Sequence, residues 1–81
     1  MSFELTKAYL DQIRDDVADG RDAVVLEALN ELHSADIAQV IDRLDLDEAV
    51  YMYRLLESEK AAEVLLELDE ESLSRIIQTP Q

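Results

Sequence analysis

The stretch SADIAQVIDRLD at residues 34–45 decides the fold, because it recurs 24 residues later as SEKAAEVLLELD at residues 58–69. A fainter period of 12 residues relates residues 22–33 to the first copy. The positions that are identical in the two copies are Ser34/Ser58, Ala38/Ala62, Val40/Val64, Leu44/Leu68 and Asp45/Asp69. Short amphipathic helices that repeat in this way predict an all-α solenoid, in which each helix pair buries its apolar face on its neighbours.

The repeat lies in a chain that is predicted to be helical throughout. Residues 1–20 are expected to form an N-terminal amphipathic helix that ends at Gly20, and residues 21–81 are expected to form the repeat domain. Helix starts in that domain are predicted where a side chain can cap a helix N-terminus. The capping candidates are Asp22, Ser34, Asp45 or Asp47, Ser58 and Asp69.

The last helix is predicted to stop at Thr79 and Pro80, because proline cannot continue a helix. Its apolar stripe of Leu73, Ile76 and Ile77 is not followed by the polar cap that usually closes a solenoid. We therefore expect either that the array continues beyond residue 81 or that this end packs on another chain.

Composition excludes several classes of function. The chain has 81 residues, with 20 acidic against 7 basic side chains and a net charge of −13, so phosphate backbones and anionic lipids are repelled. It has no cysteine, a single histidine (His33) and no glycine-rich loop, so neither a nucleophile–base pair nor a phosphate cradle can form. No apolar run approaches the length of a membrane span. The sequence therefore predicts a soluble protein that is not an enzyme.

The second copy of the repeat carries a row of glutamates that the first copy lacks. Glu59, Glu63 and Glu67 fall four residues apart, and Glu71 is expected to extend the row by one turn. The positions in the first copy that match Glu59, Glu63 and Glu67 hold Ala35, Gln39 and Arg43, so the fold does not require acid there. Mg²⁺ would suit such a row, because it keeps most of its waters and takes one or two carboxylates. Spacing by itself favours a solvated face over an ion site.

The same residues carry a resemblance to a known family. The segment LHSADIAQVIDRLD, followed after a spacer by LLESEKAAEVLLELDEE, resembles the intracellular N-terminal domain of MgtE-type magnesium transporters, with EKAAEVL at residues 59–65 as its most specific part. The resemblance covers roughly residues 22–81. The family usually has proline where this chain has Ser34, and both residues are acceptable at a helix start.

This resemblance implies a fold, a function and partners. The fold would be a right-handed superhelix, and the domain would lie on the cytoplasmic side of the cell membrane in a homodimeric transporter. A pair of CBS domains and a transmembrane pore would follow it. The domain would sense cytosolic Mg²⁺, because bound ions would screen its carboxylates against acidic CBS surfaces and favour the closed pore. Of the four glutamates, the resemblance singles out Glu63 as a Mg²⁺ ligand, with the other ligands of this domain beyond residue 81.

A second function stays open on the residues alone. An acidic helical-repeat module of this kind could dock a basic protein surface, since solenoids often bind partners along their exposed faces. The cluster of Tyr51, Met52 and Tyr53 is interpreted as packing residues, and a partner-binding groove beside them remains an alternative.

Overall fold

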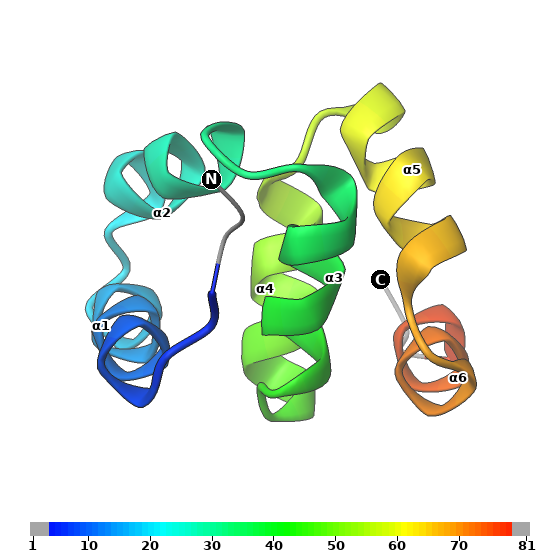
Figure 1. Cartoon of the computed structure of the whole chain (residues 1–81), viewed down its shortest axis with the longest axis horizontal. Helices are drawn as coiled ribbons and strands as arrows, with labels where there is room; N and C mark the ends of the chain where they lie inside the picture. The colour runs from blue at the N-terminus through cyan, green and yellow to red at the C-terminus, as the bar shows by residue number, and fades with distance from the viewer. Residues whose placement is uncertain (1–3, 79–81) are drawn as a thin grey trace.

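The computed structural model describes residues 4–78, and all regular structure in that range is helical (Figure 1). The six helices are α1 (Lys7–Ala18), α2 (Asp22–Asn30), α3 (Ser34–Asp42), α4 (Leu46–Leu55), α5 (Ser58–Glu67) and α6 (Glu70–Gln78). The predicted all-α class is confirmed. None of the helices among residues 4–78 is long and apolar enough to cross a membrane.

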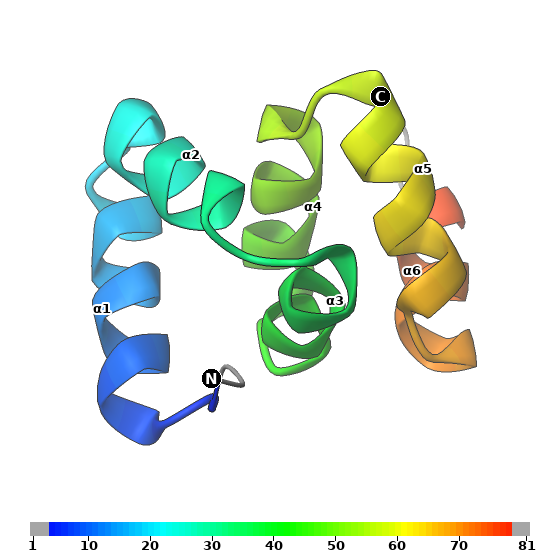
Figure 2. The ribbon, with the colours of Figure 1, turned by 45° about the horizontal axis from the view of Figure 1, so that its top comes forward.

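The helices follow the period of the sequence. Helices α2 to α6 begin twelve residues apart, at Asp22, Ser34, Leu46, Ser58 and Glu70. Helix α3 packs against α5 and α4 against α6, so helices that match across the 24-residue repeat lie against each other. In two views, α3 and α4 lie between α1–α2 and α5–α6 (Figure 1 and Figure 2). The repeat therefore sets the helix starts and the packing, while the right-handed superhelix stays a prediction.

The core is built from matching positions of successive twelve-residue units. Buried side chains recur three and six residues after a helix start, on one helix face, and again ten residues after it, just beyond the end of the helix. The buried residues at these positions are Val25, Ile37, Ala49, Ala61, Val40, Met52, Val64, Leu44, Leu56 and Leu68. Each short helix thus contributes one apolar stripe, and these stripes contribute most of one shared cluster.

Helix α1 is shorter than the predicted N-terminal helix of residues 1–20. It begins after Thr6, whose hydroxyl accepts a hydrogen bond from the backbone N–H of Tyr9 at 3.1 Å. It ends at Ala18, and Gly20, the predicted C′ residue, follows the C-cap Asp19 with a positive φ of 70°. The N–H groups of Gly20 and Arg21 donate to the carbonyls of Val17 and Asp16 at 3.1 and 3.0 Å, which is the Schellman pattern. Residues 1–3 lie outside the described range.

Two of the predicted caps are confirmed and three are wrong by one residue. Asp45 precedes α4, and Asp69 precedes α6 and accepts from the N–H of Ser72 at 2.7 Å. Asp22, Ser34 and Ser58 are instead the first residues of their helices. The N-cap positions are occupied by Arg21, His33 and Glu57, whose side chains make no capping hydrogen bond. The carbonyls of these three preceding residues already accept the first helical hydrogen bonds, so each helix starts one residue earlier than its polar side chain suggests.

Candidate cation-binding surface

Helix α5 presents its glutamates on the face opposite the core. Ala61 and Val64 are buried, whereas Glu59, Glu63 and Glu67 are all exposed. Because exposed carboxylates at this spacing repel one another, the face carries a concentrated negative charge that the fold itself does not neutralise. An incoming cation would reach all three side chains from solvent.

Glu71 does not extend this row, contrary to the prediction. Helix α5 ends at Glu67, and Leu68 is buried in an extended conformation, with φ −71° and ψ 151°. Asp69 then caps a new helix, and Glu71 lies exposed in the first turn of α6. Burial of Leu68 in an extended conformation and capping of the next helix by Asp69 prevent α5 from continuing, so α5 ends at Glu67. The expected extension of the row by one turn is therefore wrong.

The four glutamates do not converge on a closed metal site. Within residues 4–78, no group of three or more His, Cys, Asp or Glu side chains is arranged to hold a metal ion. A hydrated Mg²⁺ can be held by one or two carboxylates, which is what an open glutamate row offers. Any tighter site on this face needs oxygen ligands from a second surface.

Glu63 differs from the other glutamates of the row in its contact with another helix. The hydroxyl of Ser34 donates to Oε2 of Glu63 at 3.5 Å, across 29 residues of sequence. Ser34 is the first residue of α3, so this carboxylate lies at the partially positive end of that helix. The sequence does not predict this contact, because the pattern around Ser34 indicates only a helix start. The 24-residue repeat was the one signal that could have placed α3 beside α5.

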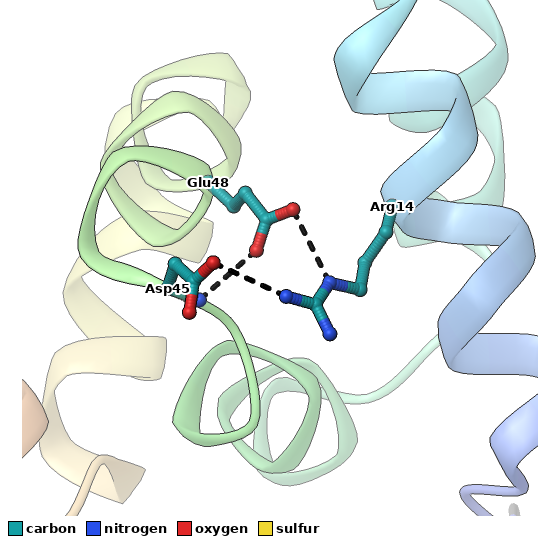
Figure 3. A network of polar contacts seen from close by, with 3 residues as sticks. All are labelled: Arg14, Asp45 and Glu48. Carbon is teal, nitrogen blue, oxygen red and sulfur yellow. Dashed lines mark hydrogen bonds and ion pairs between the residues drawn. The ribbon is translucent and has the colours of Figure 1, made fainter.

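A second polar network, away from the glutamate row, joins α1 to α4 (Figure 3). Arg14 donates from Nε to Oε2 of Glu48 and from Nη2 to Oδ2 of Asp45, both at 3.2 Å. Glu48 also accepts from the backbone N–H of Asp45 at 3.0 Å, as in a capping box. Hydrogen bonding to Glu48, and then the charge of Glu48, raise the pKa of Arg14 above its ordinary value. The two ion pairs of Arg14 connect α1 to the start of α4.

A groove with many apolar side chains runs along α4, α5 and α6, on a different edge of α5. Its lining includes Tyr53, Leu65 and Ile76, which are half-buried, and Ile77, which is 67% exposed. Tyr51 and Tyr53 pack against the core, which confirms their interpretation as packing residues. Leu66, on the outer face of α5, is 86% exposed. An apolar groove with polar residues in its lining is typical of an interaction face.

Comparison with known proteins places this arrangement in a family. Neither curated proteins nor solved structures include a match to the chain. The family described as the MgtE intracellular N domain matches residues 32–81. That match covers more than half of the chain, with all of α3 to α6 and the four glutamates. It is the domain of a transporter and not a family of enzymes. The chain therefore belongs to the MgtE intracellular N domain family.

Proposed function

We propose that this chain is the cytosolic regulatory domain of an MgtE-like Mg²⁺ transporter and that it senses intracellular Mg²⁺ through the exposed face of α5. The observation that carries the proposal is the family match across residues 32–81, which includes EKAAEVL. The exposed glutamates and the net charge of −13 supply the chemistry, because a divalent cation is attracted to such a face.

The proposed mechanism takes its partners and its gating from the family resemblance, and the open geometry of the row is compatible with it. Glu63 is the principal ligand, Glu59 and Glu67 add negative charge on the same face of α5, and Glu71 adds a carboxylate from the first turn of α6. Since residues 4–78 hold no convergent three-ligand site, the ion is shared with acidic CBS surfaces of the same transporter. Bound Mg²⁺ screens the two acidic surfaces and favours the closed pore, whereas loss of Mg²⁺ lets them repel and frees the domain.

The remaining features of the proposal concern the assembly. The domain lies on the cytoplasmic side of the cell membrane, joined to CBS domains and a transmembrane domain in a homodimer. Its helices form a right-handed superhelix, supported by the matching contacts of α3 with α5 and α4 with α6. The role is regulatory and not catalytic.

A Mg²⁺ titration of the chain followed by NMR tests the proposal. We expect the backbone and carboxylate signals around Glu63 to shift with millimolar Mg²⁺, and the shift to be lost in Glu63→Gln. The matched control is Glu27→Gln, which makes the same charge change at an exposed glutamate of α2, outside the family match. Equal responses in both variants would show general screening and would count against a site at Glu63.

The groove and the exposed Leu66 favour a second candidate, an acidic helical-repeat module that docks a basic protein surface. The two functions differ in their response to salt. If the chain docks a basic partner, raising the ionic strength weakens the binding to the same extent with MgCl₂ as with NaCl. If the chain senses Mg²⁺, MgCl₂ shifts the NMR signals around Glu63, whereas NaCl at the same ionic strength leaves them unchanged. Parallel titrations with MgCl₂ and NaCl separate them.

A further inference from the structure

The groove along α4, α5 and α6 is the uncovered copy of a surface that is buried elsewhere in the molecule. The side chains that line it on α5 and α6 are Ser58, Ala61, Ala62, Leu65, Ile76 and Ile77. Their counterparts 24 residues earlier lie on α3 and α4, which pack against α5 and α6. The counterparts that are no more than 1% exposed are Ile37, Ala38, Ile41 and Met52. The groove is therefore a helix-packing face that no helix among residues 4–78 covers.

An exposed leucine lies beside this groove. Leu66 follows Ala62 by four residues, so it lies one turn further along the same edge of α5. It is 86% exposed, and Ile77 of the groove lining is 67% exposed. The residue that matches Leu66 in the first copy of the repeat is Asp42, so the repeat does not require an apolar side chain there. One face of the molecule thus carries both an apolar projection and an apolar groove.

The charges on this face are also complementary to one another. Arg54 is exposed, and it is the one charged side chain among the described residues that line the groove. On α5, Leu66 has Glu63 three residues before it and Glu67 directly after it, and both glutamates are exposed. An identical chain that inserted Leu66 into the groove would therefore bring carboxylates to a surface that carries a cation.

We propose that this face binds the same face of a second copy of the chain, with Leu66 of each copy in the groove of the other. A twofold axis brings identical patches of two chains together, so the contact between projection and groove forms twice. Helices α5 and α6 lie at the end of the molecule away from α1 and α2, where a second copy can approach them (Figure 1 and Figure 2). The proposal goes beyond the proposed function, because it does not use the cation site.

Net charge sets the conditions under which this association is expected. Two chains of net charge −13 repel each other, and salt screens that repulsion. Contacts between apolar side chains do not depend on such charges. The dimer should therefore become stronger as NaCl is raised, whereas docking of a basic partner should become weaker.

Sedimentation equilibrium of the full chain without Mg²⁺ tests the proposal. Between about 10 μM and about 1 mM, where an interface of modest affinity forms, the average mass should rise from that of one chain toward that of two. Leu66→Asp installs the residue of the first copy and should raise the dissociation constant at least about tenfold, as expected for an anchoring residue. Val24→Asp is the matched control and should leave it unchanged, because Val24 is an exposed apolar residue of α2 that receives the same charge.

A second measurement locates the contact between the two copies. In a mixture of isotope-labelled and unlabelled chains, NOEs between chains should join the methyl groups of Leu66 to Tyr53 and Ile76. A chain that stays monomeric at every concentration and salt would mean that a different occupant covers the groove, and it would overturn the proposal. Equal weakening by Leu66→Asp and Val24→Asp, or NOEs between chains on another face, would overturn it as well. The response of Glu63 to Mg²⁺ is measured separately, so failure of one proposal leaves the other to its own test.

Discussion

The two copies of the repeat share a pattern of side chains but differ in what covers them. Ala38 is 1% exposed, whereas the identical residue Ala62, 24 positions later, is exposed. Met52 is 0% exposed, and its counterpart Ile76 is only half-buried. The first pair, α3 and α4, is covered by α5 and α6, and the second pair presents the matching face to solvent. An apolar pattern thus specifies a face, while burial depends on the next helix pair.

The largest expected effect tests this contrast at the two identical alanines. Ala38→Gln places an amide in a packed interface and should cost about 3 kcal/mol of unfolding free energy or more. Ala62→Gln at an exposed position should change stability by no more than about 0.5 kcal/mol. Urea unfolding followed by circular dichroism measures both.

If Ala38→Gln does not fold, Ala38→Ser against Ala62→Ser gives a milder version of the same comparison. Equal losses at the two positions would mean that α5 and α6 do not cover the first pair as described.

A smaller difference in stability cost is expected between alanine substitutions at Met52 and at its counterpart Ile76. Met52→Ala removes a fully buried side chain and leaves a cavity, which should cost about 2–5 kcal/mol. Ile76→Ala removes a half-buried side chain and should cost about 1 kcal/mol. The measurement is the urea midpoint at constant slope. A loss for Ile76→Ala as large as that for Met52→Ala would indicate that something covers α6 in solution.

A still smaller loss of stability is expected when the ion pairs between α1 and the first helix pair are removed. Arg14 bridges to Asp45 and Glu48, whereas Asp69, the counterpart of Asp45, accepts from the backbone N–H of Ser72 at the start of α6. Arg14→Gln should lower the melting temperature and make the amides of α1 exchange faster, with little change in α6.

Lys7→Gln is the control for this variant, because the ion pair of Lys7 with Asp11 is highly exposed. Faster exchange in α6 as well would show that Arg14 stabilises the whole domain and not one pair.

The sequence predicted the helices well because each unit repeats its own local signals. Apolar spacing, Gly20, Asp45 and Asp69 are all local, and the structure uses them as expected. The wrong prediction that Glu71 extends the row also concerns a local signal. A capping residue at Asp69 ends α5, so the row could not also run through it.

The contacts between helices could not be predicted in the same way. Arg14 reaches residues 31 and 34 positions away, and Ser34 reaches Glu63 across 29 positions. Such pairs depend on which helices are adjacent and on how they are rotated. Periodicity indicates which face of a helix turns inward, but it does not identify which side chain of a neighbouring helix lies opposite a given residue. The sequence therefore predicts the candidate site only as a row of glutamates. The structure adds the contact of Ser34 with Glu63, which distinguishes Glu63 from Glu59 and Glu67.

The most direct test of the account gives the second copy of the repeat the residues of the first. The triple variant Glu59→Ala, Glu63→Gln and Glu67→Arg installs the side chains found at Ala35, Gln39 and Arg43. Because all three positions are exposed, the helical circular dichroism spectrum should be unchanged. Millimolar Mg²⁺ should shift the NMR signals of α5 in the unaltered chain and leave them unmoved in the variant. Equal Mg²⁺ shifts in the two proteins would contradict the account.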